Sequence, residues 1–401
     1  MHNLNALRFR LACLLHVSYQ VLGAGNLRLN EPMSNWTING RFVGQPVGGV
    51  QRYAEEIVRS LDRRIGRSNA FRRLNIDIAV PTETQVSLDL ANIPVRRFGR
   101  TKGPLWEQTE LPFRVSGGLL SLANSGPILK SPHIVCLHDA NTRSCKRSYT
   151  RAFRTFYGVL HPALGRTASR IATVSNFSAG ELLRYRVAVD EKKVLVAPGG
   201  HEHALGWKAA HTCETRCVAG RGTIVAIGST VDHKNIAMLV ALAPRLAQEG
   251  LQLAIVGAAN PRVFASIKPT MAHVATNVHW LGTIADNALA ALLQDCLCLA
   301  FPSLAEGFGL PPIEAMALGC PVVVSNCASL PEVCGGAALY ASPDTPEIWL
   351  QHFRRLKSDC SFRSALIKKG KIQASNFRWD ATASIYLDAM SQLDIEPSGA
   401  H

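Results

Sequence analysis

Two carboxylates stand close together in the segment 302–314, Glu306 in a loop that contains glycines and Glu314 in the helix expected after it. Gly307 and Gly309 allow the backbone to approach a ligand closely, and the two prolines that follow suit the first turn of a helix. The free amides and the positive dipole end of such a helix bind phosphate groups. The segment therefore predicts a phosphate-binding loop whose two carboxylates lie at different depths and have different roles.

A lysine, Lys234, follows the strand expected at 223–227 and opens the next helix. A flexible ammonium at that place can neutralise a diphosphate. The sequence has no Asp-x-Asp motif, so we expect no metal ion and no cofactor. A departing phosphate would instead be stabilised by Lys234, the helix dipole and backbone amides.

Glu306 and Glu314, with Gly-Phe-Gly-Leu-Pro between them, resemble the signature of the retaining GT-B glycosyltransferases of family 4, the glycosyl transferases group 1. The resemblance implies that Glu306 contacts the donor sugar near its 3-hydroxyl and is catalytic. It also implies that Glu314 holds the ribose hydroxyls of the nucleotide and that Lys234 contacts the diphosphate. A capping carboxylate plus an ordinary surface glutamate is the alternative, which the surrounding glycines, prolines and strand disfavour.

The same resemblance extends the donor site over further residues. Expected donor contacts are Gly49, Gly228, Ser229, His233, Leu281, Gly307, Phe308, Gly309 and Leu310. Leu281 would pass beside the nucleotide base, and plain core packing explains it equally well. Many relatives carry an arginine where Ser229 or His233 stands, so here His233 or a residue elsewhere must replace that arginine.

The acceptor side is expected in the N-terminal half. His138 and Asp139 end a strand expected at 133–137, and residues at strand ends face the cleft of open α/β sheets. Resemblance to the polysaccharide mannosyltransferase branch implies that His138 contacts the sugar or the acceptor, with Asp139 orienting it. A hydrogen-bonded strand-end histidine is the alternative. The branch resemblance also puts Trp106 and Arg52 on the acceptor side.

Alternating strand-like and helix-like segments must position these residues. Strands are expected at 36–42, 74–80, 133–137, 171–174, 194–197, 223–227, 252–256, 298–301 and 321–324. Helices are expected at 50–62, 179–185, 235–248, 286–293, 312–318 and 379–393. Such alternation implies parallel sheets with right-handed crossovers. We predict an α/β fold of the GT-B type: two Rossmann-like, doubly wound domains facing a cleft, with the last helix crossing back.

A chain of 401 residues exceeds one ordinary hydrophobic core, so two domains are expected. We assign an acceptor domain to 33–198, a linker to 199–222, a donor domain to 223–376, and a crossover helix and tail to 377–401. Residues 1–32, with Arg8 and Arg10 before a short apolar run, are expected to be a poorly ordered extension. A weak anchor at a membrane surface is the alternative.

Composition limits the partners. Lys and Arg outnumber Asp and Glu by 43 to 29, and the formal charge of +14 favours polyanionic neighbours. The basic residues are scattered rather than clustered, so we expect no nucleic-acid partner. The eleven cysteines lack framework spacing and are expected to be free thiols in a reducing compartment. We expect a cytoplasmic enzyme at the inner face of the plasma membrane, with an anionic membrane surface as a candidate partner.

The combined hypothesis is a hexosyltransferase. It would move a hexose, with mannose favoured, from a nucleotide-sugar to a saccharide acceptor linked to polyprenyl diphosphate, in surface polysaccharide or lipopolysaccharide biosynthesis. A degenerate GT-B protein that binds without transferring is the alternative. An NAD-dependent dehydrogenase is excluded, because Gly48-Gly49 lacks the spacing of a dinucleotide-binding turn.

Overall fold

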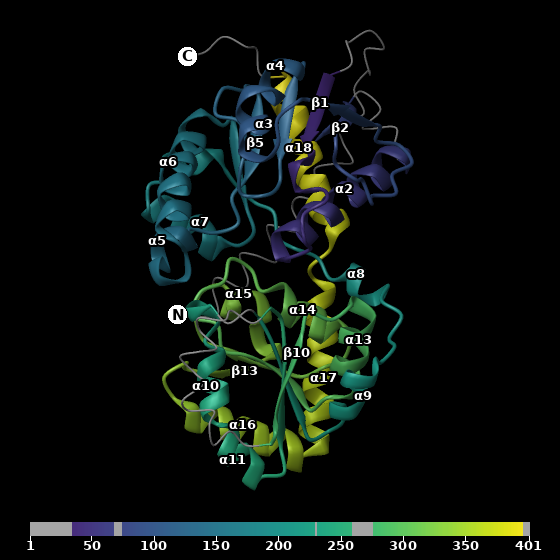
Figure 1. Cartoon of the computed structure of the whole chain (residues 1–401), viewed down its shortest axis with the longest axis vertical. Coiled ribbons are helices and arrows are strands. Elements are labelled where there is room, and N and C mark those ends of the chain that lie inside the picture. Colours follow the sequence, from purple (N-terminus) through teal and green to yellow (C-terminus); the bar gives the residue numbers. More distant parts are fainter. Residues whose placement is uncertain (1–33, 68–73, 229–230, 259–275, 396–401) are drawn as a thin grey trace, which may run out of the picture.

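A computed structural model of the chain describes residues 34–67, 74–228, 231–258 and 276–395. Two parallel sheets, each flanked by helices, follow one another along the long axis of the molecule (Figure 1). This arrangement confirms the predicted α/β fold of two Rossmann-like domains. Ser229 and the segment 1–32 lie outside the described residues, so what was expected of them stays a prediction.

The N-terminal sheet has seven strands in the order β3-β2-β1-β4-β5-β6-β7, all parallel. Its strands are β1 (Ser34–Asn39), β2 (Leu74–Pro81), β3 (Val95–Phe98), β4 (Gly118–Ser121), β5 (His133–Cys136), β6 (Arg170–Thr173) and β7 (Val194–Val196). Strands β4 and β5 are buried along their whole length, as expected where helices cover both faces of a parallel sheet. The strand order reverses between β1 and β4, which is where such sheets bind ligands.

The helices of this domain begin at recognisable caps. They are α2 (Gly49–Arg67), α3 (Gly103–Thr109), α4 (Leu111–Arg114), α5 (Asn141–Ser144), α6 (Arg151–Thr167) and α7 (Asn176–Arg184), with the 3-10 turns η1 (Gly40–Phe42), η3 (Lys146–Ser148) and η4 (Glu191–Lys193). The Ser175 hydroxyl accepts a hydrogen bond from the Ser178 amide at 3.0 Å, so α7 begins three residues before the predicted start. The predicted strand at 36–42 ends at Asn39, where η1 turns the chain.

The C-terminal sheet has six strands in the order β10-β9-β8-β11-β12-β13. They are β8 (Thr223–Ile227), β9 (Gln252–Val256), β10 (Val278–Gly282), β11 (Cys298–Phe301), β12 (Val322–Ser325) and β13 (Leu339–Ala341). Strands β8, β9 and β11 have the predicted bounds. The order reverses between β8 and β11, so the loops that follow these two strands flank the reversal point.

Helices of the C-terminal domain and of the segment before it complete the fold. They are α8 (Glu202–Leu205), α9 (Cys213–Val218), α10 (Ile236–Ala241), α11 (Ala243–Gln248), α13 (Asp286–Asp295), α14 (Leu310–Ala317), α15 (Leu330–Cys334), α16 (Pro346–Ser358) and α17 (Cys360–Ser375), with η5 (Asp232–Lys234) and η6 (Gly335–Ala337). Segment 199–222, expected to be a plain linker, contains α8 and α9. The helix expected at 235–248 is divided, because Pro244 has no N–H to continue α10.

The last helix, α18 (Trp379–Ile395), crosses back and packs along α2 (Figure 1). The hydroxyls of Tyr53 and Tyr386 lie 2.8 Å apart, and the Trp36 indole donates to the Asp394 carboxylate at 3.1 Å. One apolar cluster contains side chains from both domains and from this helix. The predicted crossover helix is thus confirmed, and it ties the two domains together.

Candidate active site between the two domains

A cavity of about 260 Å³ lies where loops of the two domains meet. The start of α2, the end of β5 and Tyr149 form its N-terminal wall, and η5 and the loop before α14 form its C-terminal wall. Most of the predicted site residues line it together: Gly49, His138, Asp139, His233, Lys234, Glu306, Gly307, Phe308, Gly309 and Leu310. Residues predicted from separate motifs therefore line one cavity.

The loop between β11 and α14 is held in shape by its own domain. The Ser329 hydroxyl donates to the carbonyls of Glu306 and Phe308, at 3.0 and 2.9 Å. Gly309 caps α14 with φ of 102°, a left-handed conformation that glycine adopts without strain. The loop and the amides at the start of α14 are therefore arranged before a ligand binds, which is what electrostatic stabilisation of an anion requires.

Gly307 joins this loop to the N-terminal domain. A Cβ atom at this position would lie 2.5 Å from the carbonyl oxygen of His138, which is closer than side chains approach. The hydroxyls of Ser175 and Ser178 both donate to the Gly307 carbonyl, at 2.6 and 3.0 Å. Glycine is therefore required because the two domains touch here, and the contact fixes His138 against the loop.

Lys234 and Glu306 form an ion pair inside the cavity, with 2.6 Å between Nζ and Oε1. Their side chains are only 21% and 12% exposed, so water screens the pair weakly. The ammonium also lies 5.4 Å from the centre of the Phe301 ring, on the strand beneath. An anionic ligand that enters the cavity can bind this ammonium by taking the place of Glu306, which frees the carboxylate.

His138 and Asp139 have protonation states set by burial. The His138 Nε2–H donates to the carbonyl of Leu122 at 2.9 Å, and burial lowers the pKa of His138 to about 4. The ring is then neutral at pH 7, and its Nδ1 is left as an acceptor. Burial raises the pKa of Asp139 to about 6, although its carboxylate accepts a hydrogen bond from the Asn141 amide. Burial and the charge of Lys234 lower the pKa of His233.

Glu314 lies in different surroundings from Glu306. It is buried in α14, and its carboxylate accepts a hydrogen bond from His203 Nε2 at 2.9 Å. The indole of Trp379 donates to Nδ1 of the same ring at 3.0 Å. An indole N–H can only donate, so Nε2 of the neutral His203 ring must carry the proton. His203 therefore orients the Glu314 carboxylate, although nothing in the sequence around it marked it as functional.

Comparisons with known proteins agree with this geometry. A family model described as "Glycosyl transferases group 1" matches residues 221–359. The chain is 30% identical over 292 residues to the MMP alpha-(1->4)-mannosyltransferase of Mycolicibacterium hassiacum, which covers 69% of each chain. The chain belongs to the group 1 glycosyltransferases.

Two further comparisons extend over most of this glycosyltransferase. It is 27% identical over 370 residues to O-antigen chain mannosyltransferase B of Escherichia coli, which covers 87% of this chain and 97% of the relative. Sucrose-phosphate synthase from Thermosynechococcus elongatus has the same fold, with a TM-score of 0.67, 18% identity, and 90% and 99% of the two chains covered. The fold is GT-B, and the chain is an enzyme of the hexosyltransferase class.

Two predicted acceptor residues of the glycosyltransferase do not face the cavity. Trp106 is fully buried inside the N-terminal domain, and its indole donates to the Phe98 carbonyl at 2.9 Å. The prediction that it lies on the acceptor side is therefore wrong for this structure. Arg52 pairs with Asp286 at 2.7 Å and lies over the Trp207 ring. It connects the two domains instead of lining the cavity.

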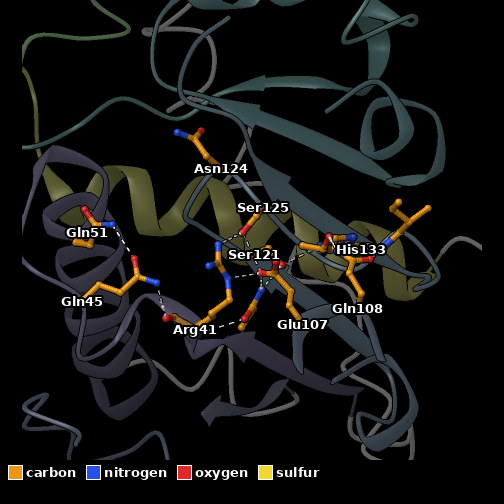
Figure 2. Close-up of polar contacts among 12 residues, drawn as sticks. Arg41, Gln45, Gln51, Glu107, Gln108, Ser121, Asn124, Ser125 and His133 are labelled. Atoms are coloured by element: carbon orange, nitrogen blue, oxygen red, sulfur yellow. Dashed lines mark hydrogen bonds and ion pairs between the residues drawn. The ribbon is translucent and has the colours of Figure 1, made fainter. Parts of the chain in front are cut away.

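The residue after Trp106 has a supporting role. Glu107 is buried and accepts hydrogen bonds from Asn39 at 2.6 Å, from Ser125 at 2.9 Å and from Arg41 at 3.1 Å (Figure 2). The charge of Arg41 compensates the buried carboxylate. Because Asn39 ends β1 and Ser125 follows β4, this network holds together the two strands at which the sheet order reverses.

Two predicted donor residues lie outside the cavity wall. Gly228 follows β8 with φ of 157°, and a Cβ there would lie 3.4 Å from the Lys234 side chain. Gly228 therefore packs against the Lys234 side chain and is not part of the cavity wall. Leu281 is half-buried in β10 and packs against the main apolar cluster, as the alternative interpretation proposed.

Tyr53, Asn141 and Tyr149 line the cavity without having been predicted. The Tyr149 ring stacks on the His233 ring across the domain boundary, with 6.1 Å between centroids and an interplanar angle of 17°. Tyr149 follows two very short helices, so no periodic pattern marks it. Tyr53 is a buried core residue of α2, and its ring also contacts His138 edge-on at 4.8 Å.

Two observations concern metal ions and membranes. In the part of the chain that the structure describes, no group of three or more His, Cys, Asp or Glu side chains could hold a metal ion. In the same ranges, no helix has the length and apolar character that crossing a membrane requires. The expectation that transfer needs no metal ion stays a prediction.

Proposed function

We propose that this glycosyltransferase transfers a mannosyl residue from a nucleoside diphosphate sugar to a saccharide acceptor with retention of the anomeric configuration. The observation that carries the proposal is the Lys234–Glu306 pair, which stands at the start of α14 in a cavity shared by both domains. The Escherichia coli and Mycolicibacterium relatives are mannosyltransferases by name, which supports mannose as the sugar.

Donor binding uses the two carboxylates differently. The diphosphate binds the Lys234 ammonium and the amides at the start of α14, so that Glu306 is released toward the sugar hydroxyls. Glu314, oriented by His203, accepts hydrogen bonds from the ribose hydroxyls. The neutral His138 ring accepts a hydrogen bond from a sugar hydroxyl through Nδ1. This division explains why one carboxylate is paired with a cation and the other with a neutral ring.

The transfer step needs no protein base. The bond between the anomeric carbon and the phosphate oxygen breaks, and the acceptor oxygen bonds to that carbon on the same face. The acceptor proton passes to the departing phosphate oxygen. Negative charge that accumulates on the leaving nucleoside diphosphate is neutralised by Lys234 and the helix dipole. Contact between the domains at Gly307 excludes water and limits hydrolysis of the donor.

We also propose that the acceptor is linked to a polyprenyl diphosphate and that the enzyme works at the cytoplasmic face of the plasma membrane. The net charge of +14 supports an anionic surface as a neighbour. The Escherichia coli relative is an O-antigen chain enzyme by name, which supports surface polysaccharide as the product class.

Calorimetric titration with GDP, UDP and dTDP tests the donor assignment. We expect one of the three to bind the wild-type chain, and the binding to be lost in Glu314→Ala. The matched control is Glu347→Ala, which removes an exposed carboxylate on α16 of the same domain and leaves the binding unchanged. Absence of binding by all three nucleotides would overturn the proposal, and a product of inverted configuration by NMR would contradict retention.

A further inference from the structure

A second and larger cavity lies on the N-terminal domain, with a volume of about 780 Å³. Its walls come from α5, η3, the first half of α6 and the residue after α7, on the side of the domain where α5 approaches the C-terminal domain (Figure 1). Four cationic side chains line it: Arg143, Lys146, Arg151 and Arg154. Hydroxyl groups complete the wall, those of Thr142, Ser144, Thr155 and Tyr185. We call this space the basic cavity.

These four cations have no carboxylate partner among the described residues. Arg143 donates to the Gly158 carbonyl at 2.9 Å, and Lys146, Arg151 and Arg154 form no ion pair with any residue that the structure describes. Elsewhere in the domain, arginines such as Arg41 and Arg59 pair with glutamates. Like charges that face one cavity repel one another, and a bound anion relieves this repulsion.

The chemistry of the basic cavity suits a phosphoryl group. Guanidinium groups match phosphate oxygens with paired N–H donors, and hydroxyls add neutral donors. The cavity also includes residues of the first turn of α6, whose N-cap is Thr150, so the positive end of the helix dipole adds to the attraction. Four cations, several hydroxyls and a helix start therefore favour the same class of ligand.

The basic cavity is linked to the active site by shared wall residues. A third cavity of about 250 Å³ shares Ser144 and Tyr185 with the basic cavity. It shares Asp139 and Asn141 with the cavity that contains Glu306. The three cavities are therefore neighbours in a row, which we call the groove, and the row ends at the site of transfer.

Apolar side chains are exposed on the same helix. Phe153, Phe156 and Val159 follow at intervals of three residues along α6 and are 41%, 41% and 68% exposed. Arg151 and Arg154, which line the basic cavity, belong to the same turns. A cationic site beside an exposed apolar ridge suits a ligand that joins a phosphoryl group to a hydrocarbon chain.

We propose that the basic cavity binds the phosphoryl group of the acceptor, whose sugar then reaches Glu306 along the groove. That the ligand is the acceptor rests on the proposed transferase function, whereas the anion site rests on the cavity alone. The phosphoryl group could belong to a lipid-linked diphosphate or to a soluble sugar phosphate. The apolar ridge on α6 favours the lipid-linked form.

Calorimetric titration of the full chain with inorganic pyrophosphate tests the site, with the donor site saturated by the nucleoside diphosphate found to bind it. In the double variant Arg151→Gln, Arg154→Gln we expect the dissociation constant to rise roughly 10- to 100-fold, because charge-assisted hydrogen bonds to phosphate are lost. The matched control is Lys192→Gln, Lys193→Gln, which removes two charges of the same domain outside the cavity and leaves the constant unchanged.

Further titrations distinguish a lipid-linked from a soluble phosphoryl group and show which results would overturn the site. Tighter binding of farnesyl diphosphate than of pyrophosphate, with the gain lost in Phe156→Ser, supports a lipid-linked acceptor. Equal binding of mannose 6-phosphate and pyrophosphate supports a soluble one.

Equal dissociation constants of wild type and double variant for pyrophosphate would overturn the site. Loss of binding to phosphatidylglycerol vesicles in the variant, without pyrophosphate binding by the wild type, would make the cavity a membrane contact and overturn the proposal. Nucleotide binding, measured separately, reports on the proposed function.

Discussion

The two sides of the active-site groove differ in how their charges are compensated. On the C-terminal side, Lys234 is paired with Glu306 and Glu314 with His203, so each group keeps its place without a ligand. On the N-terminal side, Arg151 and Arg154 face a cavity without a carboxylate partner among the described residues. A ligand must displace a partner on the first side and supplies the missing charge on the second. The C-terminal side, where we propose that the donor binds, is thus preorganised, and the charges of the N-terminal side are completed by what binds there.

Breaking the donor-side pair should have the largest effect. Glu306→Gln keeps the size of the side chain and removes its charge, so the sugar is no longer oriented by a carboxylate. We expect kcat to fall by roughly 10²- to 10³-fold, the usual loss when one preorganised electrostatic contact is removed. Nucleotide affinity, measured by calorimetry, stays within about threefold because Glu314 holds the ribose. Near-native turnover in steady-state assays would contradict the assignment.

Acid should unfold the N-terminal domain first. Burial lowers the pKa of His133 to about 3 and those of His138 and His161 to about 4, and all three lie in that domain. An unfolded histidine binds a proton near pH 6.5, so between about pH 6.5 and 4 the unfolded state binds more protons. The free energy of unfolding therefore falls as the pH falls through this window.

Asp139 acts in the opposite direction. Because its pKa is raised to about 6, the folded state binds the Asp139 proton more tightly than the unfolded state does. The resulting stabilisation is complete below about pH 4 and is lost as the pH rises through 6. His161→Gln can keep the hydrogen bond to the Asn124 carbonyl and removes one proton-binding difference. Between pH 7 and 4, the free energy of unfolding should fall less in this variant than in wild type, by up to about 3 kcal/mol. Hydrogen exchange resolved by domain measures both effects, and earlier exposure of the C-terminal sheet would contradict the prediction.

Removing the support of Glu314 should weaken nucleotide binding about tenfold, the cost of one hydrogen bond to a charged group. His203→Phe keeps a ring against Trp379 and loses the donor to the Glu314 carboxylate. We expect kcat at saturation to stay within about twofold, because the transition-state contacts of Glu306 are intact. His203→Gln, which can still donate, should restore most of the affinity. A fall in kcat with unchanged affinity would show that His203 does not act through Glu314.

The smallest effect is expected at the ion pair that connects the domains. Asp286→Asn removes the partner of Arg52, and the Asp286 side chain is 39% exposed. The free energy of unfolding in urea should therefore fall by less than about 1 kcal/mol, and by less still at high salt. The KM for the acceptor should not change. A large rise in that KM for Arg52→Gln would restore the acceptor role predicted from sequence.

Local patterns predicted the parts of the molecule that local interactions determine. Strands β8, β9 and β11 are continuous buried runs, and their bounds were correct. The loop before α14 was marked by glycine and proline, whose backbone preferences do not depend on distant residues. Helix α6 was not predicted from the sequence. Its residues Phe153, Phe156 and Val159 are exposed, so its apolar residues do not fall on one buried face.

Contacts between distant segments account for the other differences. His203 has its role because Trp379, 176 residues further on, fixes the tautomer of its ring. Trp106 was assigned to the cleft by motif position, but Phe98 and the network of Glu107 lie inside the domain and hold α3 there. The basic cavity collects residues from α5, η3, α6 and the residue after α7, and none of these segments has a distinctive pattern alone. Side-chain partners of this kind cannot be found from spacing along the chain.

Helix α18 makes the shape of the active site depend on a segment that is distant in sequence. Its residue Asp394 bonds Trp36 on β1, 358 positions earlier, and Tyr386 meets Tyr53, whose ring contacts His138. A chain that grows from its N-terminus therefore exposes an open face of α2 until α18 has been synthesised. The N-terminal domain is thus first in sequence but last to close, and His138 gains its final surroundings only when the C-terminal domain already exists.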